Sequence, residues 1–344
     1  MTNQAERWRR QRALGLLLFF MLIGAAGGAL YRLIFDPASE REAGQFARSM
    51  AQGMLLATAL FLADSAFTAL EARYRKRPPL LESFLIRAVA LSGVIVITIA
   101  ASEALLTGHL PSPDWLRQIL PRVLGPALLT GFLIQAVVSV ASLVGLSELL
   151  SFVLGRYRRP IIEERIVMFA DLVGSTRIAE RLGEAGAQEL LATLFREIDP
   201  VFRGHGARVM SYVGDAVIVT WPCQAGNANR ALACGLELER RLRDLGPGFE
   251  TRFGVRPELR VSAHAGPVAI GEIGESRKQI ALLGDVVNVA ARMEEEAKAR
   301  GERFLASEAL LERAAPAWRG RARSLGPRPL RGRAEPVELF AIEG

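Results

Sequence analysis

Four long apolar stretches occupy most of the first 150 of the 344 residues. Residues 13–31 and 123–147 contain no charged side chain, and residues 50–70 and 84–102 contain one each. A helix of about 20 apolar residues spans the roughly 30 Å hydrocarbon core of a bilayer. The pattern therefore predicts four membrane-spanning helices, which form an all-α transmembrane domain over residues 1–146. A cleaved signal peptide is the alternative for the first stretch, but three more stretches follow it without a clear small-residue cleavage site.

Basic residues divide unequally along the chain. Residues 1–159 contain 17 Lys and Arg against 10 Asp and Glu, whereas residues 160–344 contain 26 of each kind. A basic, apolar half is typical of a membrane protein and argues against nucleic acid as a partner. Eleven basic residues lie on one side of the predicted spans: Arg7, Arg9, Arg10, Arg12, Arg73, Arg75, Lys76, Arg77, Arg156, Arg158 and Arg159. Because Lys and Arg stay on the cytoplasmic side, we expect a multi-pass protein of the cell (inner) membrane, bathed in membrane lipid, with its N-terminus and soluble half in the cytoplasm.

Two ionisable side chains, Asp64 and Arg87, interrupt the second and third stretches near the predicted cytoplasmic face. They could pair across neighbouring spans as a sensing or switch site. Alternatively, each could extend from the end of its span toward the headgroups, which is the more common situation at this depth.

Residues 147–160 are expected to form a coupling helix or linker. Its apolar residues follow helical spacing: Leu146, Leu149, Leu150, Val153 and Leu154. Pro160 ends any helix after the basic run GRYRRP. The apolar stripe could pair with its copy in a dimer, or it could lie on the inner leaflet with the arginines on anionic lipid.

Strand and helix patterns alternate over the remaining residues. Strands are expected at 166–170, 208–213, 216–221, 259–273 and 337–342, and helices at 188–202, 227–245 and 285–300. Gly214 and Asp215 separate two of these strands as a hairpin turn. The order predicts an α+β, ferredoxin-like sheet with its helices on one face.

Two aspartates stand at the ends of these strands. Asp171 ends the first strand, and Asp215 follows 44 residues later in the hairpin turn. If the strands are neighbours, both carboxylates project from one edge of the sheet. Paired carboxylates suit hard divalent cations such as Mg²⁺, which keep water ligands and bind substrate phosphates. An aspartate after glycine is also a common turn residue, so these two positions alone leave a structural role open.

Three motifs follow one another in this half: FADLVGST at 169–176, YVGDAVIVTW at 212–221 and LGDVVNVAARME at 283–294. Together they resemble the class III nucleotidyl cyclases, the family of adenylate and guanylate cyclases, over roughly residues 160–344. The run GRYRRPIIEER before the first strand is similar to membrane-anchored bacterial members. The resemblance implies a class III cyclase catalytic domain over residues 161–344.

The resemblance also implies roles for five side chains. Asp171 and Asp215 match the aspartates that hold two Mg²⁺ or Mn²⁺ ions per active site. Asn288 and Arg292 match the residues that orient the ribose and stabilise the transition state, and their i, i+4 spacing places both on one helical face. Arg331 matches a position where the family usually has a lysine that contacts the terminal phosphates. Family sites combine aspartates from one domain with Asn and Arg from another, which implies a homodimer.

The positions that read the base in this family depart from its pattern. Ser211 stands where adenylate cyclases commonly have Lys, and Ala281 stands where they have Asp or Thr; guanylate cyclases commonly have Glu and Cys there. We expect an adenylate cyclase that converts a nucleoside triphosphate, ATP, to 3′,5′-cyclic AMP and pyrophosphate. A guanylate cyclase and a catalytically silent cyclase-like receptor are alternatives. A polymerase-like or diguanylate-forming domain is a third, against which Asn288 and Arg292 argue.

Two further features are interpreted as structural. His264 lies among small residues of a strand, where a lone histidine is more often a structural residue than a catalytic one. The acidic run at residues 294–296 is expected on a solvated helix face.

Overall fold

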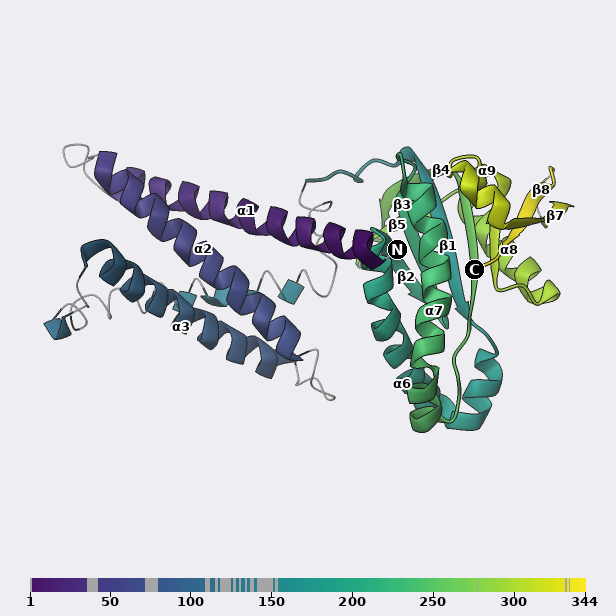
Figure 1. Cartoon of the computed structure of the whole chain (residues 1–344), viewed down its shortest axis with the longest axis horizontal. Helices are drawn as coiled ribbons and strands as arrows, with labels where there is room; N and C mark the ends of the chain where they lie inside the picture. The colour runs from purple at the N-terminus through teal and green to yellow at the C-terminus, as the bar shows by residue number, and fades with distance from the viewer. Residues whose placement is uncertain are drawn as a thin grey trace. The chain divides into compact units, whose positions relative to one another are not determined.

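The structure is a computed structural model, which divides into two compact units, Met1–Leu150 and Ser151–Gly344 (Figure 1). It describes residues 2–35, 43–71, 80–108, 112–114, 117, 125, 128–129, 131–133, 135–136, 139–140, 151, 154–276, 278–331, 333 and 335–344. The division falls inside the predicted linker at 147–160. Most of the apolar stripe predicted there lies outside the described residues, although Leu154 is described and exposed.

Three long helices are described in the first unit: α1 (Thr2–Phe35), α2 (Ala43–Glu71) and α3 (Leu80–Thr107). Within the described part, Gly44–Thr68 and Leu81–Leu105 are each 25 residues long and apolar enough to cross a membrane, and Leu17–Tyr31 is a shorter apolar helix. Of the span expected at 123–147, the described residues are helical and the others lie outside the described part. Four spans therefore remain a prediction.

Helices α1 and α2 approach each other at small residues. A Cβ added to Gly24 would lie 2.3 Å from the carbonyl oxygen of Gly53, and one added to Gly28 would lie 2.0 Å from that of Ser49. No side chain fits at either glycine, so the two backbones touch directly. Small residues at such crossings are typical of helices that pack within a membrane, where close van der Waals contact drives association.

Helices α2 and α3 are joined by two ion pairs. Arg87 Nη1 lies 3.2 Å from Asp64 Oδ1, and Arg48 Nη2 lies 3.0 Å from Glu103 Oε2. On each helix the two charges that form these pairs are 16 residues apart, about 24 Å along a helix axis, so the pairs lie at opposite ends of the α2–α3 contact. The pairing of Asp64 with Arg87 is thus confirmed, whereas a sensing role for it remains a prediction.

We predict that Asp64 and Arg87 are energetically coupled. Asp64→Ala should lower the thermal unfolding midpoint of the detergent-purified chain, because it removes the ion pair of Asp64 with the buried Arg87 guanidinium. The exchanged pair Asp64→Arg with Arg87→Asp should regain part of the loss, with a coupling energy of about 0.5–3 kcal/mol. Ser65→Ala, at the exposed neighbouring position, is the control. Strictly additive losses in the double variant would show that the pair contributes nothing.

The second unit contains a mixed eight-stranded sheet with strand order β2-β3-β1-β4-β6-β8-β7, in which β5 pairs with β4. The strands are β1 (Ile161–Leu172), β2 (Arg208–Val213), β3 (Ala216–Pro222), β4 (Leu259–Ile273), β5 (Gln279–Leu283), β6 (Phe304–Ser307), β7 (Ala322–Arg328) and β8 (Val337–Ile342). The helices are α6 (Ser175–Gly204), α7 (Asn227–Phe253), α8 (Asp285–Arg300), α9 (Glu308–Leu311) and the 3₁₀ helix η2 (Pro316–Arg321). The predicted α+β class and the hairpin at Gly214-Asp215 are confirmed.

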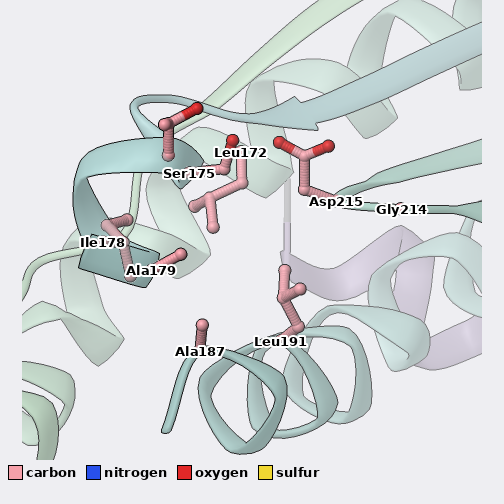
Figure 2. A pocket seen from close by; sticks show the side chains of 9 residues that line it. Leu172, Ser175, Ile178, Ala179, Ala187, Leu191, Gly214 and Asp215 are labelled. Atoms are coloured by element: carbon pink, nitrogen blue, oxygen red, sulfur yellow. The ribbon is translucent and has the colours of Figure 1, made fainter. Parts of the chain in front are cut away.

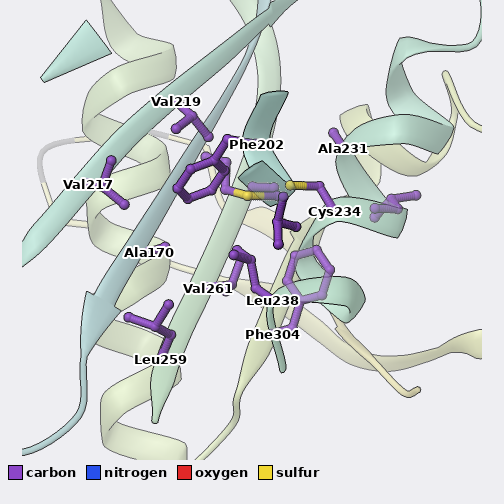
Figure 3. Packing of buried hydrophobic residues seen from close by; sticks show 14 of the residues in the cluster. Ala170, Phe202, Val217, Val219, Ala231, Cys234, Leu238, Leu259, Val261 and Phe304 are labelled. Atoms are coloured by element: carbon purple, nitrogen blue, oxygen red, sulfur yellow. The ribbon is translucent and has the colours of Figure 1, made fainter. Parts of the chain in front are cut away.

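Strand β1 is buried on both of its faces. Its residues Ile166 and Met168 join the core that α6 and α7 cover, which also contains Phe202, Cys234 and Phe304 (Figure 3). Val167 points to the opposite face because successive strand residues alternate, and it packs in a cluster with residues of α8. The prediction that the helices lie on one face is therefore wrong: α8 covers the face opposite α6 and α7.

Burial on α8 follows one stripe of the helix. Val286, Val289, Ala290 and Met293 are at most 2% exposed and fall at i, i+3, i+4 and i+7, the spacing of one helical face. This stripe packs on the sheet, and the remaining face of α8 points away from it.

Candidate active site

Pairing of β1 with the β2–β3 hairpin brings the two predicted aspartates together. Asp171 is the register partner of Ala216, the residue after Asp215, and the Leu172 amide donates to the Asp215 carbonyl oxygen over 3.3 Å. Gly214 takes a positive φ of 62°, which permits the tight turn that places Asp215 there. The expectation that both carboxylates lie at one edge of the sheet is therefore met by the backbone geometry.

The two carboxylates also interact electrostatically, and the interaction is repulsive. Burial, the charge of Asp215 and the charge and hydrogen bond of Glu294 together raise the pKa of Asp171 to about 7. Arg260 acts in the opposite direction, with Nη1 3.9 Å from Asp171 Oδ2. Crowded carboxylates of this kind are stabilised by a cation placed between them.

Arg260 and Glu294 belong to this site, although they were not expected there from the sequence. Arg260 Nη1 lies 3.2 Å from Glu294 Oε1, and both side chains are less than one-fifth exposed. The interpretation of residues 294–296 as a solvated face is therefore wrong for Glu294. Arg260 is the register partner of Asp171 on β4, so a cation in an otherwise apolar strand was the available signal.

Asn288 and Arg292 lie on α8, outside its buried stripe. Asn288 is exposed, and Arg292 keeps one-third of its side chain exposed while Nη1 lies 3.4 Å from Glu295 Oε2. Within the part of the chain that the structure describes, no hydrogen bond or ion pair joins either residue to Asp171 or Asp215. The two residues face outward from the chain, where a second molecule can meet them.

The other three predicted positions lie on three different segments, and the structure does not bring all of them to this edge: Ala281 pairs near the end of β4 that is opposite to Arg260. Ser211, on β2, is half-buried beside a register shift in its pairing with β3. Ala281, on β5, is half-buried and opposite Gly271. Arg331 is exposed in the segment that follows β7, and Arg333 in the same segment lies 3.6 Å from Asp285 at the start of α8.

A cavity of about 410 Å³ lies beside Asp215, between the start of α6 and the β2–β3 turn (Figure 2). Its floor is apolar, with Leu172, Ile178 and Leu191 among the lining residues, and Ser175 and Asp215 are the polar groups labelled at its rim. The carboxylate of Asp215 therefore borders open space from which a ligand can approach.

His264 is not part of this edge. It is 7% exposed, and its Nδ1 lies 2.7 Å from the Ser307 hydroxyl. Burial, with a smaller effect from Arg333, lowers the pKa of His264 to about 4, so the ring is neutral at pH 7. The interpretation of His264 as structural agrees with this environment.

Comparison with known proteins decides the family. The family model of the adenylate and guanylate cyclase catalytic domain matches residues 160–334, about half of the chain. This chain belongs to that family. The three sequence motifs, at residues 169–176, 212–221 and 283–294, all lie inside the matched range.

Proteins similar to this chain include both adenylate cyclases and guanylate cyclases. Adenylate cyclase 2 of Rhizobium meliloti is 36% identical over 222 residues, which cover 64% of this chain and 61% of that protein. The receptor-type guanylate cyclase gcy-23 of Caenorhabditis elegans is 32% identical over 130 residues, 37% of this chain and 12% of that protein. Among solved structures, the adenylyl cyclase CyaB from P. aeruginosa is 21% identical with a TM-score of 0.49, over 54% of this chain and 96% of that one. The chain thus spans less than two-thirds of the curated relatives' lengths.

Class III cyclases generally use divalent metal ions, and the donors here fit such an ion. Among the described residues there is no group of three or more His, Cys, Asp or Glu side chains arranged to hold a metal alone. Two crowded carboxylates beside open space are suited instead to Mg²⁺ or Mn²⁺, which take one or two carboxylates and complete their shell with water and substrate phosphates. Asp171 and Asp215 are the residues that would hold it.

We predict that Asp171→Asn stabilises the metal-free chain at high pH. Ionisation of Asp171 is unfavourable in the folded chain because its pKa is raised to about 7, so wild-type stability falls as the pH rises from about 4 through 7. In EDTA at pH 8 the variant should unfold roughly 2–4 °C above wild type, the shift that about 1 kcal/mol produces in a domain of this size. The difference should shrink at pH 5. An equal difference at both pH values, or the same gain from the exposed control Asp244→Asn, would contradict this.

Proposed function

We propose that this chain is an integral-membrane adenylate cyclase that converts ATP to 3′,5′-cyclic AMP and pyrophosphate. The observation that carries the proposal is the meeting of Asp171 and Asp215 at one sheet edge in a chain of the cyclase family. The 36% identity to an adenylate cyclase supports ATP as the substrate. Ser211 and Ala281 offer a hydroxyl and a methyl group where the family usually reads the base, so guanylate cyclase activity is the alternative.

In the proposed reaction the ribose 3′-hydroxyl loses its proton to solvent, and its oxygen forms a bond with the α-phosphorus. The bond from that phosphorus to the bridging oxygen breaks, and pyrophosphate leaves. Asp171 and Asp215 would hold Mg²⁺ or Mn²⁺, which would supply Lewis-acid chemistry to the reaction. Glu294 and Arg260 fix the orientation of the Asp171 carboxylate from behind. Arg331 binds the terminal phosphates with its guanidinium fork.

Arg292 and Asn288 act on the ribose and the reacting phosphate. Asn288 orients the ribose, and the Arg292 guanidinium meets the negative charge that develops in the transition state. Removal of such a donor costs on the order of 10²–10⁴ in turnover. The ion pair of Arg292 with Glu295 is surface-exposed and weak, so the guanidinium can leave it for a phosphate.

The complete site is proposed to form in a homodimer. Asn288 and Arg292 lie outside the buried stripe of α8, and within the described residues no hydrogen bond or ion pair joins them to Asp171 or Asp215 of their own chain. A two-fold dimer that places α8 of one chain against the aspartates of the other yields two equivalent sites. The candidate membrane helices support placement of this dimer at the cytoplasmic face of the cell membrane.

Product analysis tests the activity. The purified full-length chain with Mn²⁺ should convert ATP to cyclic AMP and pyrophosphate, and should turn over GTP more slowly. Asp215→Asn should lower the rate by at least about 10²-fold, since a carboxylate that holds the ions is lost. A clear preference for GTP would replace the adenylate assignment, and absence of any cyclic product would indicate a silent receptor.

Mixing of inactive variants tests the shared site. Asp171→Ala and Arg292→Ala chains should each be nearly inactive, and co-expression should restore activity, because a mixed dimer contains one intact site. With random pairing, about a quarter of the wild-type number of sites is expected. The control mixture of Asp171→Ala with Asp215→Ala should stay inactive, since both residues belong to the same half of the site. Equal recovery in both mixtures, or none in either, would contradict site sharing.

A further inference from the structure

Tyr157 lies in the short segment of the chain that connects the N-terminal unit to β1. Its side chain is 2% exposed, although Arg156, Arg158 and Arg159 beside it are exposed. Its carbonyl oxygen accepts a hydrogen bond from the Glu272 amide of β4 over 2.9 Å. Tyr157 is therefore a buried anchor of this segment on the catalytic unit.

The ring of Tyr157 belongs to a small buried cluster beneath α8. The cluster also contains Val167 of β1, Val268 and Ile270 of β4, and Val286 and Ala290 of α8. Val286 and Ala290 stand two residues before and after Asn288, and Ala290 two residues before Arg292, on the same helix. The apolar residues next to Asn288 and Arg292 on α8 thus pack in the same cluster as Tyr157.

Polar contacts fix the other end of the tyrosine. Its hydroxyl accepts from Arg165 Nη2 over 3.4 Å, and Arg165 is itself buried. Arg165 Nη2 also lies 2.6 Å from Glu163 Oε2, and Arg156 Nη2 lies 3.1 Å from Glu163 Oε1. The Arg165–Glu163 pair is largely buried and resists rearrangement, because separation would leave an uncompensated charge, whereas Arg156 is mostly exposed. Tyr157 therefore connects the polar contacts of β1, through its hydroxyl, with the apolar cluster to which α8 contributes, through its ring.

We propose that Tyr157 is a positioning residue for Asn288 and Arg292, through which the segment leaving the membrane unit sets the placement of α8. This rests on the proposed cyclase function. Packed cores shift between discrete arrangements and do not deform smoothly, so a pull on this segment either withdraws the ring and opens a void under α8 or moves the helix. Either change alters the distance from α8 to the partner's aspartates. A misplacement of about 1 Å at a reacting centre can lower the rate by about 10²-fold.

The first test compares two mixed dimers of the full-length chain, in each of which only one site is complete. In the first, Tyr157→Ala is added to the Arg292→Ala chain, which supplies only aspartates. In the second, Tyr157→Ala is added to the Asp171→Ala chain, which supplies α8. The first should keep the activity of the parent mixture, and the second should lose about 10-fold to 10²-fold in kcat. Equal losses in both would show a general structural role and overturn the proposal.

Two further variants distinguish the effect of losing the Tyr157 ring from the effect of a general loss of stability. Tyr157→Phe keeps the ring and should retain most of the activity in both dimers. Leu242→Ala opens a void on the opposite face of the sheet, under α7, and should affect both dimers alike. An asymmetric loss from Leu242→Ala would overturn the proposal, since asymmetry would then follow from any loss of stability.

The second test needs no activity. Tyr157→Ala should increase amide hydrogen exchange in α8, over Val286–Met293, with little change in α7, when the full-length chain is compared with wild type. Unchanged exchange in α8 would overturn the proposal even if the chain is an active cyclase. Increased exchange in α8 would support it even if the substrate assignment fails.

Discussion

Two carboxylates held close together in a half-buried position repel each other, and the active edge of this protein is organised around that repulsion. The antiparallel pairing of β1 with β3 fixes Asp171 next to the turn that carries Asp215, so the two groups cannot separate without loss of ladder hydrogen bonds. Arg260 offsets part of the charge, while Glu294 adds to it. The folded chain therefore presents an excess of negative charge at a site that borders open space, which is the condition for binding a divalent cation.

Helices cover both faces of the sheet, and the large apolar core and the proposed site lie on opposite faces. The face under α6 and α7 holds the large apolar core, whereas the face under α8 carries Asp171 and Arg260. Helix α8 uses one stripe to bury apolar residues and presents Asn288 and Arg292 on another. A small shift of α8 can thus change the site without disturbing the larger core. In the N-terminal unit, the paired charges at both ends of the α2–α3 contact hold those helices in register.

The sequence alone predicts those features of the site that depend on residues close together along the chain. The Gly214-Asp215 hairpin, the strand that ends near Asp171 and the helical spacing of Asn288 and Arg292 are local patterns, and the motifs identify the family. Contacts between distant segments were not predictable: Arg260 with Glu294, Arg48 with Glu103, and Tyr157 with α8 each depend on tertiary packing. The covering of both faces of the sheet was not predicted, although β1 carries a signal for it. A continuous apolar run that also includes Val167 indicates burial on two faces.

Direct measurement of metal binding tests the central claim. We would titrate Mn²⁺ into the full-length chain in the presence of 3′-deoxy-ATP, which lacks the attacking hydroxyl and cannot cyclise. Calorimetry should show two Mn²⁺ ions per chain for wild type and for the control Asp244→Asn, and strongly weakened binding for Asp171→Asn and for Asp215→Asn. Unchanged Mn²⁺ affinity and stoichiometry in both site variants would contradict the account, because the two aspartates would then not be the ligands.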